Sequence, residues 1–192
     1  MKRIKLTQRK DLEVFKRHFE RRAGNHVSLD YLAASDVYAY RDGDELVAGY
    51  VIHGGQQHRF FDLMTQIGFE RIQALPGEQQ DFVEITCMWM QPEARSFPLR
   101  LRFYSSCMYH TFSLRKRFII GGTKIDAVSQ MQRYCLPYTL FKGETENSIG
   151  SGNWIVYYGT AGTFARGFAR LLGRESLRAL SGQKKRQVST AS

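Results

Sequence analysis

Residues 81–96, DFVEITCMWMQPEARS, decide the fold expected for this chain. The first ten are rich in β-branched and aromatic residues, which is typical of a buried strand. Pro92 ends that run, and Ser96 and Pro98 then have the spacing of an N-cap and a first-turn proline. The mostly apolar residues 99–112 continue the pattern, so a buried strand followed at once by a helix is predicted here.

Helices and strands are expected to alternate on both sides of this segment. The clearest turn is Asp42-Gly43, which joins two strand-like runs. The elements expected before residue 81 are a strand at 1–7, a helix at 8–22, a hairpin at 36–53 and a short helix at 58–67. Those expected after it are a strand at 117–122 that stops at two glycines, a helix at 124–134, a strand at 153–159 and a helix at 162–180. The order predicts a mixed α/β chain.

Composition and charge narrow the class of protein. A length of 192 residues fits one domain of ordinary size, or one domain with tails. Three cysteines and the lack of an apolar segment in the basic N-terminus favour a cytoplasmic protein without a disulfide framework. Residues 1–26 and 160–192 each carry a net charge of +6. These basic ends are either solvated surface or contacts for nucleic acid, an anionic membrane surface or an acidic protein.

The order of elements, with an early hairpin and a late strand–helix–strand–helix unit, resembles the GNAT acyltransferase fold. DFVEITCMWMQPEARS resembles that family's central strand and its exit, and RFIIGGTKIDAVSQMQRYCLPYTLFKGE (117–144) resembles the strand, helix and closing turn that follow. The resemblance implies a mixed, mostly antiparallel central sheet flanked by helices, with a C-terminal helix. It further implies a GNAT-like domain at 1–160, a basic C-terminal helix at 161–180 and a disordered tail at 181–192.

The phosphate loop departs from the usual GNAT pattern. That family has Arg/Gln-x-x-Gly-x-Gly/Ala, whereas residues 95–100 read RSFPLR and contain no glycine. Pro98 also removes one backbone N–H donor. In this respect the chain is more similar to the acyl-homoserine-lactone synthases and N-acyl amino acid synthases, which take long acyl chains, often from acyl carrier protein.

The resemblance implies transfer of an acyl group from a thioester, either acyl-CoA or acyl carrier protein, to a small-molecule amine. It implies that Glu84 assists deprotonation of the amine and that Tyr134 protonates the leaving thiol, with Tyr138 as a weaker substitute. The donor would pass between the central strand and a neighbour from which it splays. The residues expected to bind the donor are Met88, Met90, Arg95, Ser96 and Arg100.

Each of these residues also has an ordinary structural interpretation. Strand alternation places Phe82, Glu84, Thr86 and Met88 on one face, which is either a buried face or a polar outer one. Tyr134 would then be an ordinary helix tyrosine, and the arginines a solvated turn. The resemblance also implies that several aromatic side chains line a tunnel for the acyl chain, but these could instead be ordinary core residues. They are Phe60, Phe61, Trp89, Phe97, Phe103 and Tyr104.

Other chemistry has weaker support in the sequence. Cys87, Cys107 and Cys135 form no C-x-x-C pair, and the cysteines and histidines match no zinc pattern, so no metal is expected. Arginines recur every four residues along the last helix, at 166, 170, 174 and 178. Two further functional classes therefore remain open: a non-catalytic binding module on the same fold, and a basic nucleic-acid-binding protein.

Overall fold

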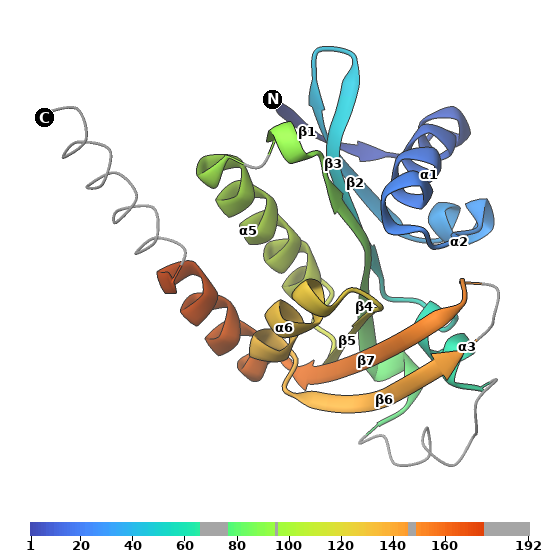
Figure 1. Cartoon of the computed structure of the whole chain (residues 1–192), viewed down its shortest axis with the longest axis vertical. Helices are drawn as coiled ribbons and strands as arrows, with labels where there is room; N and C mark the ends of the chain where they lie inside the picture. Colours follow the sequence, from blue (N-terminus) through green and yellow to red (C-terminus); the bar gives the residue numbers. More distant parts are fainter. Residues whose placement is uncertain (66–76, 95, 146–148, 175–192) are drawn as a thin grey trace, which may run out of the picture.

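A seven-stranded sheet organises the chain, for which a computed structural model describes residues 1–65, 77–94, 96–145 and 149–174. The strand order is β1-β2-β3-β4-β5-β7-β6, and every neighbouring pair is antiparallel except β4 and β5, which are parallel (Figure 1). The strands are β1 (Lys2–Leu6), β2 (Asp36–Asp42), β3 (Glu45–His53), β4 (Phe82–Met90), β5 (Phe118–Thr123), β6 (Tyr138–Thr145) and β7 (Gly152–Thr160). This confirms the predicted mixed, mostly antiparallel sheet.

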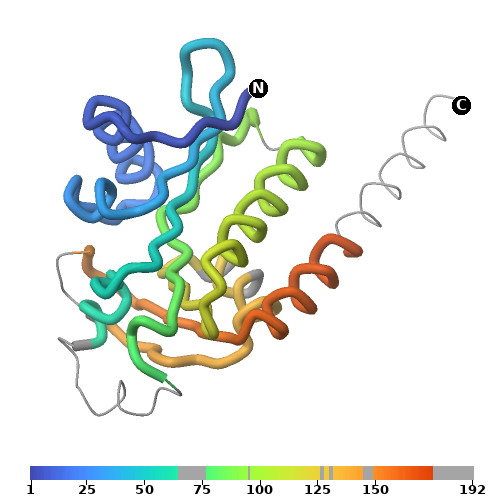
Figure 2. Tube along the Cα trace, turned by 180° about the vertical axis from the view of Figure 1, so that it is seen from behind, coloured from blue at the N-terminus to red at the C-terminus, as the bar shows by residue number. Residues whose placement is uncertain are grey.

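Helices cover both faces of the sheet (Figure 2). The helices are α1 (Arg9–Ala23), α2 (Leu29–Ala33), α3 (Arg59–Thr65), α5 (Phe97–Ser113), α6 (Asp126–Cys135) and a C-terminal helix over 161–174. Side chains from α1, α2 and α3 pack in two clusters on one face, whereas α5, the end of α6 and the C-terminal helix share a third cluster on the other. We refer to these as the α1–α3 face and the α5 face.

The central strand β4 contains a bulge that changes its alternation. Gly49 of β3 pairs with Trp89 and Val51 pairs with Thr86, so two residues of β4 stand opposite the single residue Tyr50. One of them, Cys87, has φ of 49°, a left-handed conformation that is uncommon for a residue with a Cβ. Met88 therefore packs with the α5-face cluster, and the prediction that it shares a face with Glu84 and Thr86 is wrong.

The parallel pair of β4 and β5 is short. Pairing runs from Phe82 opposite Phe118 to Glu84 opposite Ile120, and then stops. Beyond that point β5 still pairs with β7 through Thr123, and β4 still pairs with β3 up to Met90. The two strands therefore part after Glu84, as the resemblance implied. From there on, the β5-facing backbone edge of β4 has no strand partner among the residues that the structure describes.

Strand β5 lies within one residue of its predicted range and includes both glycines. Neighbouring groups leave little room for a side chain at Gly122: a Cβ there would lie 2.7 Å from Phe60 Cε1 and 3.1 Å from the Ile155 carbonyl oxygen. Strand β6 was not predicted at all. It has few buried side chains, Phe141 being one, so its sequence carries little strand pattern and its place depends on pairing with β7.

Arg115 provides a direct test of local backbone strain. It follows the C-cap of α5, is exposed, and has φ of 52°, where glycine is the preferred residue. We expect Arg115→Gly to raise the free energy of unfolding by about 1 kcal/mol. Arg115→Ala removes the same side chain but keeps Cβ, so it should not stabilise. Equal stabilisation by both variants in denaturant titrations would contradict this explanation.

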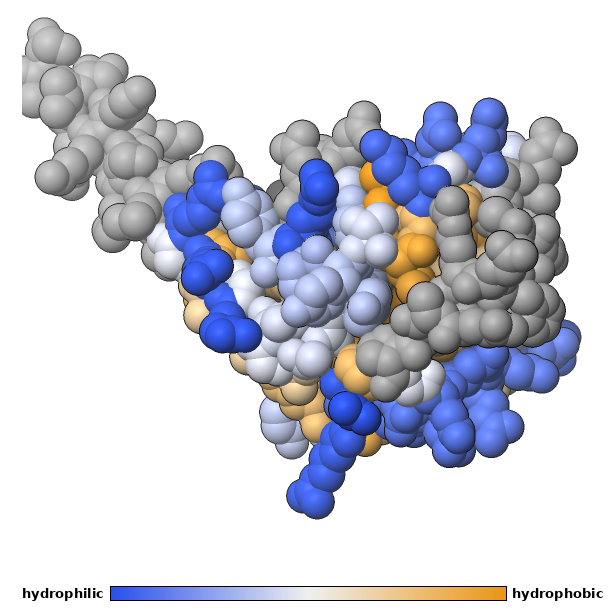
Figure 3. Space-filling view, turned by 90° about the horizontal axis from the view of Figure 1, so that it is seen from below, coloured by the Kyte–Doolittle hydropathy of each residue, from blue (hydrophilic) through white to orange (hydrophobic). Residues whose placement is uncertain are grey.

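The C-terminal helix packs closely against the body through a glycine. Phe164 and Phe168 enter the α5-face cluster, and Gly167 lies against the carbonyl of Tyr134 at the end of α6. Figure 3 shows a row of strongly hydrophilic side chains on the outer side of this helix, with hydrophobic atoms where it meets the body. Residues 175–180 of the predicted helix and the predicted tail at 181–192 lie outside the described residues. Among the described residues, no helix combines the length and apolar character that crossing a bilayer requires.

Candidate active site

Glu84 lies at the point where β4 and β5 part. It is the last residue of β4 that pairs with β5, and on its other edge it stands opposite His53 of β3. Its side chain is completely buried on the α1–α3 face, so the alternative of an outward-facing polar residue is excluded. Burying a carboxylate is costly unless partners compensate it, and such a position is therefore a candidate for chemistry.

Three polar side chains surround this carboxylate, and we call Tyr31, His53, His58 and Glu84 the Glu84 cluster. His58 Nδ1 lies 3.6 Å from a carboxylate oxygen of Glu84, and the two residues are both fully buried. The rings of His53 and His58 are 5.4 Å apart, and that of Tyr31 is 4.9 Å from His53. Strand pairing and helices α2 and α3 thus bring together residues spread over more than fifty positions of sequence.

One backbone carbonyl and one serine hydroxyl determine which histidine nitrogens carry protons in this cluster. His58 Nε2 lies 3.0 Å from the carbonyl oxygen of Gln79, to which only an N–H can donate. The hydroxyl of Ser35 donates to the Tyr31 carbonyl at 2.6 Å, so His53 Nδ1, 2.9 Å away, donates to Ser35 Oγ. In their neutral forms, both histidines therefore keep an acceptor nitrogen: Nδ1 of His58, which faces Glu84, and Nε2 of His53.

The Glu84 cluster has more hydrogen-bonding capacity than its own residues use. Tyr31 and Glu84 interact through their side chains. Even so, five buried atoms of the cluster lack a hydrogen-bond partner in good geometry among the described residues: Tyr31 Oη, His53 Nε2, His58 Nδ1 and both carboxylate oxygens of Glu84. Buried polar atoms in native proteins are nearly always paired, so a group of unpaired ones indicates a place for a ligand or water. Four of the five are acceptors when the histidines are neutral, which fits a ligand that carries N–H donors.

Burial changes the proton affinities around Glu84. It raises the pKa of Tyr31 well above its usual value, with the Glu84 charge adding to the effect. It also lowers the pKa of His53, an effect that outweighs the opposing influence of the Glu84 charge. His53 is therefore held in its neutral, acceptor form near neutral pH, while Tyr31 keeps its proton.

A buried arginine lies beside the cluster. Arg59, the first residue of α3, donates to Thr86 Oγ1 and Cys87 Sγ, both at 3.0 Å, and to the carbonyl of His26. Its guanidinium lies 5.5 Å from the ring of Tyr31, and the residue is only 7% exposed. Among the described residues, no carboxylate lies within ion-pair distance of this guanidinium. A buried positive charge therefore remains without an anionic partner next to Glu84.

The residues predicted to bind the donor lie on the other side of the sheet. Met88 and Met90 are partly buried against the α5-face cluster, on the part of β4 beyond Glu84. Ser96 is the exposed N-cap residue of α5, and its carbonyl accepts from the backbone N–H of the half-buried Arg100 at 3.0 Å. Arg95 lies outside the described residues. The end of β4 and the start of α5 thus carry the described candidates.

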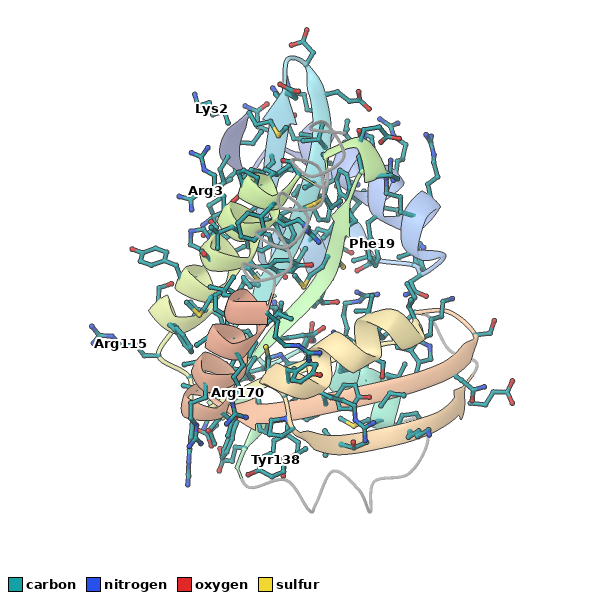
Figure 4. The ribbon with its side chains drawn as sticks, turned by 60° about the vertical axis from the view of Figure 1, so that its left-hand side comes forward. Lys2, Arg3, Phe19, Arg115, Tyr138 and Arg170 are labelled. Carbon is teal, nitrogen blue, oxygen red and sulfur yellow. The ribbon has the colours of Figure 1, made fainter. Side chains whose placement is uncertain are left out.

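Tyr134 lies apart from Glu84, near the end of α6. It is 45% exposed, and its hydroxyl oxygen accepts a hydrogen bond from Arg174 of the C-terminal helix, whose guanidinium also lies 5.1 Å from the ring. Because the oxygen accepts, its own O–H remains available to donate. Tyr138, the weaker substitute, is 49% exposed and packs on Tyr158 (Figure 4).

The cysteines do not have the surroundings of nucleophiles. Cys87, Cys107 and Cys135 are free and buried, and burial raises their thiol pKa values to about 11, about 12 and about 11. These thiols are therefore protonated and unreactive at neutral pH. Within the described ranges, no group of three or more His, Cys, Asp or Glu side chains is arranged to hold a metal ion.

Comparison with known proteins places the fold. No protein-family model matches the sequence, and no curated protein matches it. The structure is similar to that of FeeM, an N-acyl amino acid synthase from uncultured soil microbes, with a TM-score of 0.65 over 85% of this chain and 91% of that one at 10% identity. It is also similar to MesI, a CoA-dependent acyl-homoserine lactone synthase, with a TM-score of 0.56 over 90% and 95% of the two chains at 14% identity.

A third solved structure agrees with these two. LasI, an acyl-homoserine-lactone synthase, has a TM-score of 0.53 over 81% of this chain and 90% of its own, at 9% identity. The chain therefore has a GNAT-like fold, similar to the structures of the synthase branch, as its sequence predicts.

Sequence reasoning found Glu84 but not the residues around it. His58 and Arg59 were placed in a short helix, His53 at a strand end, and Tyr31 in no predicted element. The one available signal was the pair of histidines on either side of the segment that leaves β3, at positions 53 and 58. The pairing of His53 with Glu84 depends on the register of β3 and β4, which the bulge at Cys87 shifts.

Proposed function

We propose that this protein is an acyltransferase that moves an acyl group from a thioester to a small-molecule amine. The observation that carries the proposal is the group of unpaired buried acceptors in the Glu84 cluster, placed where β4 and β5 part. In this proposal, the donor passes from one face of the sheet to the other where β4 and β5 part. A thioester arm entering from the α5 face would reach an amine held on the α1–α3 face.

The proposed reaction is a direct transfer between the two substrates. The amine nitrogen attacks the thioester carbonyl, the carbon–sulfur bond breaks, and the amine loses a proton to Glu84. His58 Nδ1, 3.6 Å from Glu84, is placed to share that proton. The leaving thiolate takes a proton, for which Tyr134 remains the candidate acid. Cys87 takes no part as a nucleophile, because burial raises its pKa to about 11.

The donor would follow the β5-facing edge of β4. Within the described part of the chain, backbone groups there have no strand partner beyond Glu84, and Met88 and Met90 provide partly buried apolar contacts. Ser96 and Arg100, at the start of α5, and Arg95 would hold the phosphate groups, with the positive end of the helix in support. Coenzyme A and the phosphopantetheine of a carrier protein both carry a phosphate and a pantetheine arm, so these features could bind either one. The proposal therefore includes both as donors.

Arg59 supports an acceptor that carries a negative charge besides its amine. The buried guanidinium lacks a carboxylate partner among the described residues, and the unpaired acceptors of the Glu84 cluster lie beside it. An amino acid offers both an N–H group and a carboxylate. The similarity to FeeM, an N-acyl amino acid synthase, points in the same direction.

The experiment measures thiol release and product mass with short and long acyl-CoA donors and with acyl carrier protein, against amino acids and their decarboxylated amines. Because the chain's own thiols are buried and protonated, they add little background to a colorimetric thiol assay. Release that depends on an amine, with preference for the amino acids, supports the proposal. A thermal shift with acyl thioesters but no release would favour the non-catalytic binding module. If no donor causes either a thermal shift or thiol release, that result would contradict acyl transfer.

A further inference from the structure

A hollow of the molecule lies away from the Glu84 cluster. It has a volume of about 520 Å³ and is lined by residues of β1, β2 and α5: Met1, Lys2, Arg3, Tyr40, Arg102, Ser105 and Ser106. We call it the β1–α5 groove. Strand β3 separates β2 from β4, so the groove is distinct from the place where β4 and β5 part.

Positive charge is concentrated in this groove. Lys2 and Arg3 come from the edge strand, where Figure 4 shows them beside α5, and Arg102 comes from the helix. Among the described residues, none of these three side chains has an acidic partner at ion-pair distance, whereas the nearby Lys5 pairs with Asp36 at 2.6 Å. Of these, Arg3 and Arg102 have their side chains on the α5 side of β1, whereas strand alternation turns Lys2 toward α1. The two arginines are like charges on one hollow, and a bound anion would relieve their repulsion.

Hydrogen bonds hold the walls of the groove in place. Arg3 donates to Ser106 Oγ, which lies 3.1 Å from the hydroxyl of the buried Tyr50. That hydroxyl lies 2.8 Å from His110 Nδ1. On the facing side, Tyr40 donates to the carbonyl of Arg102 at 3.1 Å. The cations thus project from a frame that is tied to the core on both sides, and hydroxyl groups line the space between them.

We propose that the β1–α5 groove binds a phosphate-bearing small molecule. Arginine and lysine with hydroxyl donors are the groups that recognise phosphate, and a volume of about 520 Å³ lies within the usual range for small-molecule sites. The volume suits a diphosphate or a nucleotide better than a single phosphate ion. The site is independent of the proposed acyl transfer, because it shares no residue with the Glu84 cluster or with the donor candidates.

The test measures binding of pyrophosphate, ADP and ATP to the full chain by calorimetry, with two arginine variants of α5. Arg102→Gln removes a groove charge, whereas Arg100→Gln, two positions away, removes one from the proposed donor site. We expect Arg102→Gln to weaken binding about tenfold or more, since a charge-assisted hydrogen bond is lost. The exposed Arg166→Gln should change it less than twofold. Arg100→Gln serves to detect binding of the same anions at the proposed donor site.

Equal affinity for pyrophosphate and ATP would mean that the groove recognises the phosphates alone. Tighter binding of ATP would mean that the groove also contacts the nucleoside. Either result supports the site. Three results would overturn the proposal. The first is no binding of any of these anions at millimolar concentration. The second is loss of binding in Arg100→Gln but not in Arg102→Gln, which would place the anion at the donor site. The third is an equal loss in Arg166→Gln, which would show attraction by net charge alone.

Discussion

Replacing Gly167 by alanine is expected to lower the free energy of unfolding by about 3 kcal/mol, which corresponds to a decrease in Tm of about 6–12 °C for a chain of this size. A Cβ at this position would lie 1.8 Å from the carbonyl oxygen of Tyr134 and 2.7 Å from the Cα of Cys135. Both are backbone atoms and cannot turn aside as a side chain does. The C-terminal helix would have to move away and expose Phe164 and Phe168.

Gly173 in the same helix gives a matched control. No described atom lies within 4 Å of the position its Cβ would take, so Gly173→Ala should follow helix propensity alone and raise the free energy of unfolding by about 0.5–1 kcal/mol. The two substitutions are chemically identical and differ only in surroundings. Thermal and denaturant unfolding of both variants measures the difference. Stabilisation by Gly167→Ala would show that the helix does not pack on α6 as described.

Glu84→Gln is expected to reduce the rate of acyl transfer by about 10²–10⁴-fold, the usual contribution of a general base. The variant keeps the shape of the side chain and removes its ability to take a proton from the amine. The free energy of unfolding should stay at the wild-type value or rise. The substitution removes a buried carboxylate whose two oxygens lack a hydrogen-bond partner in good geometry among the described residues. Thiol release and unfolding are measured on the same preparation.

Glu93→Gln is the control for Glu84→Gln. Glu93 is an exposed carboxylate in the short 3₁₀ helix Pro92–Ala94 that follows β4, so its replacement should leave both rate and stability near those of the wild-type chain. A structural role for Glu84 predicts the reverse pattern, with lower stability and an unchanged rate per folded molecule. That result would remove Glu84 from the chemistry and leave the Glu84 cluster as a packing feature.

The sequence predicted the parts of the fold that have strong local signals. The turn at Asp42-Gly43, the buried strand after residue 81 and the helix start at Ser96 are all confirmed. Each depends on residues close together in the chain: a glycine with φ of 58°, a run of apolar residues, and a serine followed by proline. Strand β6 lacked such a signal, because its place depends on pairing with β7. The short helix α2 was missed although Ser28 caps its first turn.

The site was predictable only in part for a related reason. Glu84 is conspicuous as a carboxylate within an apolar strand, and burial confirms that it faces the interior. Its neighbours reach it through strand register and helix packing, which a single sequence does not specify. Met88 shows how little is needed to change the outcome: the bulge at Cys87 turns it to the other face. The roles of Glu84 and Tyr134, and of the described donor residues, remain predictions.

The short contact between β4 and β5 divides the sheet into two wings, β1–β4 and β5–β7, joined along this seam by three residue pairs. The remaining seams are longer, so the backbone amides at this one should exchange with solvent first when the molecule opens locally. A pantetheine arm between the wings would hold them together by hydrogen bonding to the edge of β4 that has no strand partner among the described residues. Hydrogen exchange slowed there by an acyl thioester would locate the donor without any turnover.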